Sequence, residues 1–144
     1  MNIGATSIFD PGTRFAWGET ETKESFSESN YKWIENELLT KYNIDEQYGI
    51  VDNKMNLDLE DDVAHVKWGE NWTLPTNVFV QELRDNCRKE YFDSYVKLTS
   101  YINNKSIYFS LNGNYIVYST SQKSSRHLEN KTFYTSTNSF YGSA

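Results

Sequence analysis

The chain has very little cysteine and no long hydrophobic run. Its single cysteine, Cys87, cannot form a disulfide within the chain, so packing has to hold the core together. No apolar run approaches the roughly 20 residues that a membrane-spanning helix needs, which predicts no membrane insertion. Residues 1–6 have neither the basic start nor the apolar stretch of a signal peptide.

Clusters of basic residues are also lacking. The net charge is −6, and acidic and basic residues are interspersed along the 144 positions. A protein that grips a phosphate backbone needs grouped lysines and arginines, so we expect no nucleic-acid partner.

The motifs of common enzyme classes are absent from the sequence. It contains no phosphate-binding glycine loop, no G-x-S-x-G elbow and no H-E-x-x-H pair. Its histidines, His65 and His127, are far apart and have no further ligand at metal-binding spacing. We therefore expect no metal, no cofactor and no enzymatic activity, with His65 packed or half-exposed on a helix.

Two other groups of reactive residues are interpreted as structural. Cys87 falls on the apolar stripe of a predicted helix, where a free cysteine behaves as a small hydrophobic residue. The run Glu60, Asp61 and Asp62 is adjacent along one helix turn, and neighbours on a helix do not face one another. The pattern predicts a solvated first turn rather than a catalytic pair of carboxylates.

Aromatic residues, at 16% with 11 tyrosines, are the best functional candidates. The four tryptophans, Trp17, Trp33, Trp68 and Trp72, are predicted to lie mostly in the core. Tyrosines of the late strands and loops, Tyr108 among them, are able to stack on a sugar or anchor a protein, with a half-buried place in the sheet as the alternative. The candidate ligand-binding residues are Tyr115, Tyr118, Tyr134, Asn138 and Tyr141.

The pattern predicts one domain, 1–144, of the α+β class. Residues 1–56 lack clear periodicity and are expected to wrap the core rather than form it. A helix is predicted over residues 58–68, with Gly69 ending it. A second is predicted to begin after Thr76 as N-cap, with an apolar stripe formed by Phe79, Val80, Leu83 and Cys87.

The last third of the chain predicts strands. Residues 95–101 alternate, residues 103–105 form a turn candidate, and residues 106–111 return. The Asn-Gly pair at 112–113 is a strong turn signal before a third strand at 115–119.

Distinctive blocks of this sequence include NIGATS at 2–7, FAWGET at 15–20, YGIVDNK at 48–54 and WGENWTLPT at 68–76. Together these blocks resemble the Fibrobacter succinogenes major paralogous domain family of Bacteroidetes. The resemblance implies a C-type-lectin-like fold of two helices and a twisted antiparallel sheet. That fold is shared with formylglycine-generating enzymes and with the variable proteins of retroelements. The enzymes use a cysteine pair, which Cys87 alone does not supply.

The chain departs from the family in ways that affect the expectations. Thr73-Leu74 stands where the family has Arg-Met, and the closing strands of the family are missing after Ala144. A sheet shortened in this way is expected to expose an edge and favour self-association.

Together these observations predict a non-catalytic recognition module that binds glycan or protein. By family resemblance it is exported to a bacterial surface. The alternative is a structural or assembly domain joined through an exposed sheet edge, and the third is an inactive remote relative of the enzymes.

Overall fold

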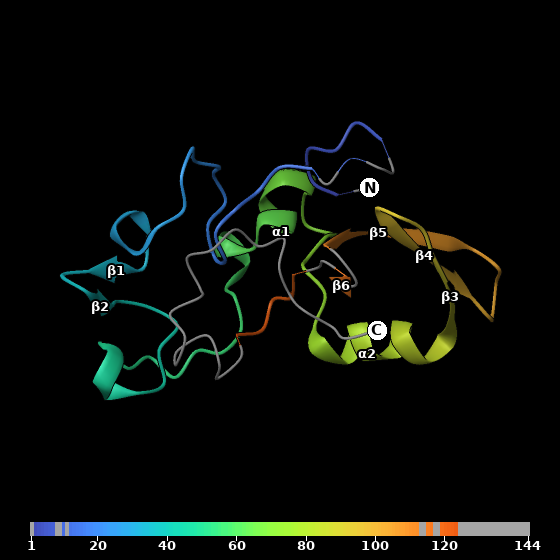
Figure 1. The fold of residues 1–144 in the computed structure, drawn as a ribbon. Helices are drawn as coiled ribbons and strands as arrows, with labels where there is room; N and C mark the ends of the chain where they lie inside the picture. The colour runs from blue at the N-terminus through green and yellow to red at the C-terminus, as the bar shows by residue number, and fades with distance from the viewer. Residues whose placement is uncertain (1, 8–9, 11, 113–114, 117–118, 124–144) are drawn as a thin grey trace.

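The computed structural model describes residues 2–7, 10, 12–112, 115–116 and 119–123. This part of the chain is mixed α+β, as predicted, with two α-helices and two small antiparallel sheets (Figure 1). The helices are α1 (Val63–Trp68) and α2 (Asn77–Asn86). Strands β1 (Ile34–Glu35) and β2 (Leu38–Leu39) form the smaller sheet. The larger has the order β3-β4-β5-β6, with bounds Cys87–Tyr91, Tyr95–Ser100, Ser106–Asn112 and Tyr115–Ile116.

The larger sheet buries one face against α2, which runs along one side of it in Figure 1. Side chains alternate between the faces of a strand, so Cys87, Val96 and Leu98 meet on the inner face. These three residues are buried and contact Leu83 of α2. Strands β4 and β5 match the prediction, whereas β3 was not predicted.

Cys87 does not lie on the helix stripe where the sequence placed it. The helix ends at Asn86, and Cys87 has an extended backbone (φ −126°, ψ 140°) as the first residue of β3. The predicted stripe is also only partly right. Leu83 packs into the core, but Phe79 is 54% exposed.

The predicted helix over residues 58–68 is divided in two. A 3-10 turn, Leu59–Asp61, comes first, and α1 begins only after Asp62. Asp62 has an extended backbone (ψ 109°), which interrupts the helix, and its carboxylate caps the first turn of α1. The C-terminal signal is confirmed, because Gly69 follows α1 directly with a φ of +96°.

The first 56 residues form a core of their own, so the prediction that they only wrap the core is wrong. Ala16, Tyr31 and Leu39 are buried together beside β1 and β2. Tyr31 donates its hydroxyl to the carbonyl of Trp17 at 2.8 Å. The buried residues of this segment come from turns and aromatic side chains rather than from long helices or strands. Their positions in the sequence therefore show no simple periodicity. The two short 3-10 helices of this region are Glu28–Asn30 and Glu46–Tyr48.

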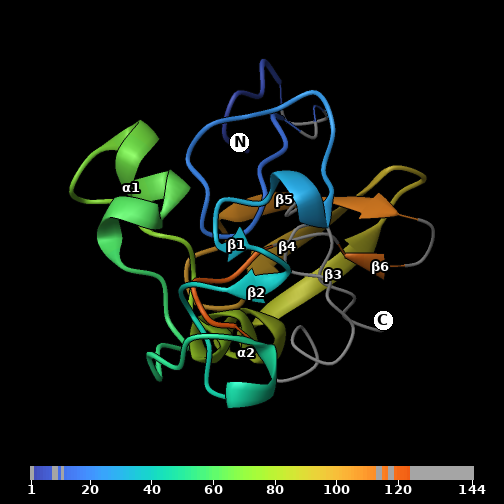
Figure 2. The ribbon, with the colours of Figure 1, turned by 90° about the vertical axis from the view of Figure 1, so that its left-hand side faces the viewer.

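Residues 120–123 run back into the N-terminal half and join it to α2. Trp17 donates its indole N–H to the carbonyl of Thr120 at 3.0 Å, and the amide of Lys123 donates to Met55 at 2.7 Å. The amide of Ser121 donates to the carbonyl of Pro75, at the start of α2. Figure 2 shows this late segment, in orange-red, running among the turns of the first half. Among the described residues, no helix has the length and apolar character needed to cross a membrane.

Candidate functional site

The ligand-binding residues predicted from sequence lie almost entirely outside the described part of the chain. Tyr115 is in β6, where its backbone lies opposite Asn112. Tyr118, Tyr134, Asn138 and Tyr141 are outside the described residues. The site therefore has to be sought among other residues, and two groups stand out: a charged cluster around Asp61 and a pair of exposed tryptophans.

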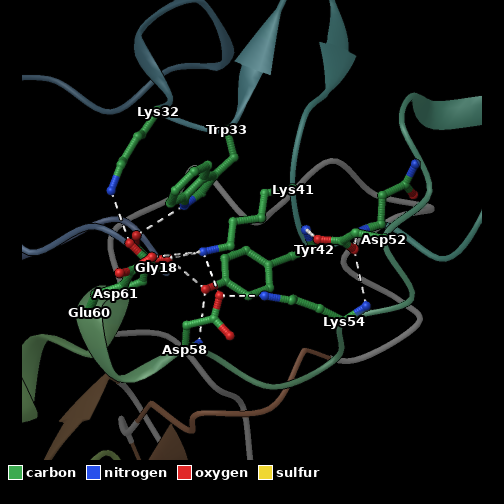
Figure 3. Close-up of polar contacts among 11 residues, drawn as sticks. Gly18, Lys32, Trp33, Lys41, Tyr42, Asp52, Lys54, Asp58, Glu60 and Asp61 are labelled. Atoms are coloured by element: carbon green, nitrogen blue, oxygen red, sulfur yellow. Dashed lines mark hydrogen bonds and ion pairs between the residues drawn. The ribbon is translucent and has the colours of Figure 1, made fainter.

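The Asp61 cluster surrounds a carboxylate that is only 1% exposed (Figure 3). One oxygen of Asp61 accepts a hydrogen bond from Lys32 Nζ at 3.0 Å. The other accepts from Lys41 Nζ at 2.6 Å and from the hydroxyl of Tyr42 at 2.7 Å. Three donors thus replace the water that burial removes from this carboxylate.

Lys41 lies at the centre of the cluster. Its ammonium is 2.6 Å from Asp58 and 3.6 Å from Glu60, in addition to Asp61. The indole ring of Trp33 lies beside it, with a centroid 4.8 Å from Nζ, and the Nζ of Lys32 lies 4.2 Å from the same ring. The Trp33 ring is held in turn by its N–H bond to the carbonyl of Gly18 at 3.0 Å.

The electrostatics favour the charged forms of Asp61 and Lys41. Burial acts to raise the pKa of Asp61, but hydrogen bonds from Lys41, Tyr42 and Lys32 outweigh it and hold that pKa below its usual value. Burial acts to lower the pKa of Lys41, yet the bonds to Asp58 and Asp61 raise it well above normal. A lysine in this state has no free electron pair, so it cannot serve as a nucleophile or a base.

The same carboxylates form the one potential metal-ligand group in the described part of the chain. Oxygens of Asp58, Glu60 and Asp61 lie within 4.8 Å of one another. The ammonium of Lys41 already lies between them, and Lys32 and Lys54 pair with Asp61 and Asp58 respectively, so lysines occupy the place of a cation. We therefore interpret the Asp61 cluster as structural.

The prediction that Glu60, Asp61 and Asp62 form a solvated turn is wrong for two of the three. Asp61 and Asp62 are 1% and 2% exposed, and only Glu60 points to solvent. The counter-charges of Asp61 come from Lys32 and Lys41, 29 and 20 positions away, so no local pattern signals its burial.

Asp62 closes the base of a loop that carries two tryptophans. Its Oδ1 accepts from the amides of Ala64 and His65, and its Oδ2 accepts from the amide of Leu74 at 2.8 Å. Both ends of the segment 63–74 are therefore fixed to one buried carboxylate. We call residues 68–74 the tryptophan loop.

The rings of the tryptophan loop face solvent. Trp68 is 42% exposed and Trp72 is 54% exposed, and their rings meet edge to face with centroids 5.1 Å apart. The prediction of mostly buried tryptophans holds for Trp17, which is buried, and Trp33, which packs against the core. It is wrong for Trp68 and Trp72. An aromatic residue in a turn looks the same in the sequence whether its ring packs on the core or points into solvent.

The other reactive side chains are enclosed. Cys87 is buried, and His65 is half-buried as predicted, with its Nδ1 buried and without a hydrogen-bond partner. Lys123 is buried and donates to the carbonyl of Tyr42 at 2.5 Å. Burial lowers the pKa of Lys123 to about 8, although the charge of Asp52 opposes the shift. Sequence reasoning missed this lysine, because it lies in a polar stretch that looks like an exposed loop.

Comparison with protein-family models, with curated proteins and with solved structures finds no match for this chain.

Proposed function

We propose that this chain is a non-catalytic recognition module that binds glycan or protein. The observation that carries the proposal is the pair of exposed tryptophan rings on a loop fixed by the buried Asp62. Single exposed apolar residues are common on protein surfaces, but two large rings exposed side by side form an apolar patch, and such patches often mark interaction sites.

Hydrogen bonds restrain the conformation of the tryptophan loop. The amide of Gly69 donates to the carbonyl of His65, and the amide of Trp72 donates to that of Gly69 at 3.0 Å. Asp62 binds the first turn of α1, which leads into the loop, and Leu74 at the end of the loop, so few loop conformations have to be lost when a ligand binds. Tryptophan is also the residue most enriched among binding hot spots.

A catalytic function has less support among the described residues. The lysine with the most polar surroundings, Lys41, is paired with carboxylates, and the thiol of Cys87 is buried. A reaction centre needs a group that is both reactive and accessible. Lys41 is held in its charged form by these carboxylates, and Cys87 is inaccessible, so neither meets both conditions.

The finer identity of the fold also belongs to this proposal. We propose a C-type-lectin-like domain related to the Fibrobacter succinogenes major paralogous domain family and located at a cell surface. The sequence WGENWTLPT at 68–76 supports it, because this block forms the turn between two helices that lead into an antiparallel sheet.

The alternative of an assembly domain rests on an exposed sheet edge. In the described part of the chain, β3 is an edge strand and carries Arg88, Lys89 and Glu90 in a row. Charged side chains on an edge oppose pairing with another strand. This weighs against self-association through β3.

The proposal is tested by probing glycan and protein arrays with the unmodified chain and with the variant Trp68→Ala/Trp72→Ala. We expect the unmodified chain to bind a subset of probes and the variant to lose them. Tyr101→Ala is the matched control, since Tyr101 is an exposed aromatic residue on a separate turn. Equal binding by the tryptophan variant and the control would show that the pair does not carry recognition.

A further inference from the structure

The sheet has a second aromatic surface, on the face turned away from α2. The register places the residues opposite one another in rows: Arg88 with Thr99 and Ser106, Glu90 with Lys97 and Tyr108, and Tyr95 with Ser110. Phe92 continues the alternation of β3 beyond its end. We call these residues the outer face.

Three rings lie together on the outer face. Phe92 stacks on Tyr95 with a centroid distance of 4.5 Å and an interplanar angle of 13°. The ring of Tyr108 lies 5.9 Å from that of Tyr95. Phe92 is 44% exposed, and both tyrosines are half-buried, so the group forms a partly open aromatic platform.

The remaining outer-face residues are all polar. Thr99 and Ser106 share a hydrogen bond at 2.9 Å, and Ser110 lies opposite Tyr95. The carboxylate of Glu90 lies 3.4 Å from Arg88 and 3.7 Å from Lys97, so the charges of this face are paired with one another. The aliphatic residues Val96, Leu98 and Ile107 all belong to the inner face.

This composition distinguishes between ligand classes. A protein partner gains most from aliphatic and aromatic surface that becomes fully dry, and the outer face offers no aliphatic side chain. A polyanion needs several unpaired cations, whereas the two cations here share one carboxylate. A neutral sugar chain presents flat C–H surfaces, which stack on rings, and hydroxyls, which pair with polar side chains. Rings, hydroxyls and few unpaired charges are what such a ligand requires.

We therefore propose that the outer face of β3, β4 and β5 is a binding site for a neutral polysaccharide, with Phe92 and Tyr108 as its stacking residues. The outer-face residues extend across three neighbouring strands, which suits an extended sugar chain rather than a single sugar. The site is separate from the tryptophan loop and rests on different residues.

The experiment measures retention of the full chain in native gels that contain a neutral polysaccharide (mannan, xylan, glucan or hydroxyethyl cellulose) or the polyanion alginate. We expect retention by at least one neutral gel and none by alginate. Phe92→Ala and Tyr108→Ala should each weaken binding roughly tenfold, the scale of one lost aromatic contact. Tyr91→Ala is the matched control and should leave binding unchanged, because Tyr91 is an exposed ring of β3 that pairs with Val96 on the inner face.

Far-ultraviolet circular dichroism and thermal unfolding identify any variant that fails to fold. The variant Tyr108→Phe keeps the ring but lacks the hydroxyl, and it should retain binding. The proposal is overturned if no neutral gel retards the chain, if alginate retards it more strongly, or if the Phe92 and Tyr108 variants bind as well as Tyr91→Ala. Retention abolished only by Trp68→Ala/Trp72→Ala would overturn the outer-face site while supporting the function proposed for the tryptophan loop.

Discussion

The ammonium of Lys41 lies 2.6 Å from the carboxylate of Asp61, and the contact joins a turn after β2 to the 3-10 turn that precedes α1. Asp61 is enclosed on this side by Tyr42 and on the other by Lys32. The first half of the chain, which has almost no regular structure, is therefore organised around one ion pair as well as around its rings.

Removing the carboxylate of Asp61 should destabilise the fold strongly. Asp61→Ala leaves Lys41 and Tyr42 without their shared acceptor in a buried place, and we expect a loss of about 3 kcal/mol in the free energy of unfolding. Urea unfolding followed by tryptophan fluorescence measures it. Glu60→Gln is the control: the side chain of Glu60 is 77% exposed, so a similar loss there would contradict the assignment.

The Asp61 cluster should also make the fold sensitive to acid. Because the pKa of Asp61 is held below its unfolded value, its contribution is complete above that value and is lost as the pH falls through the folded one. The window lies below about pH 4, where an unfolded aspartate begins to take up its proton. Asp61→Asn should flatten this part of the stability profile, and an unchanged acid slope would show that other groups cause it.

Lys123 should make the fold more stable as the pH rises in the alkaline range. Its pKa is about 8 in the folded chain against 10.5 when unfolded, so the unfolded chain binds more protons between these values. Stability should therefore increase as the pH rises through this window, by about 2–3 kcal/mol from this group. Lys123→Met should remove the increase, whereas Lys105→Met, in an exposed turn, should retain it. Unfolding at pH 7.5 and 10.5 gives the comparison.

Removing the carboxylate of Asp62 should both destabilise the fold and loosen the tryptophan loop. Asp62→Ala leaves the amides of Ala64, His65 and Leu74 without their acceptor, and we expect a loss of about 2–3 kcal/mol. The emission of Trp68 and Trp72 should change as the loop loosens. Asp45→Ala removes a single exposed cap bond and should cost under about 1 kcal/mol. Equal losses for the two variants would argue against a special role for Asp62.

Two glycines with positive φ should respond very differently to alanine. At Gly49 (φ +137°) a Cβ would lie 2.3 Å from the backbone oxygen of Leu39, where nothing is able to move aside, so Gly49→Ala should prevent stable folding. At Gly69 (φ +96°) a Cβ would meet no atom within 4 Å, so the cost is the backbone conformation alone, about 1–2 kcal/mol. Thermal unfolding of both variants tests the contrast, which similar melting temperatures would refute.

The sequence predicted best those elements whose signals are local. Thr76 caps α2 through the amide of Phe79, as its position before an apolar run indicated. Strands β4 and β5 and the turn between them follow from alternation and from the Asn-Asn-Lys triplet at 103–105. Strand β3 was missed because its Arg-Lys-Glu run has low strand propensity, and pairing with β4 decides its conformation.

The candidate sites depended on information that the sequence does not hold locally. The burial of Asp61 depends on lysines 20 and 29 positions away. The outer face depends on the register between β3, β4 and β5, because only the pairing brings Phe92, Tyr95 and Tyr108 together. Of these three rings, only Tyr108 was among the late tyrosines that the sequence indicated as able to stack on a sugar or anchor a protein.

The return of residues 120–123 into the first half has a consequence for the order of folding. Trp17 and Tyr42 complete their hydrogen bonds only with Thr120 and Lys123, 103 and 81 positions later. During synthesis, the hairpin of β4 and β5 is able to form as soon as it leaves the ribosome, since its contacts are short-range. The N-terminal core lacks these two hydrogen bonds until the late segment arrives. We therefore expect chains halted before residue 120 to be less stable, and to be held by chaperones and removed by proteases more readily than the full chain.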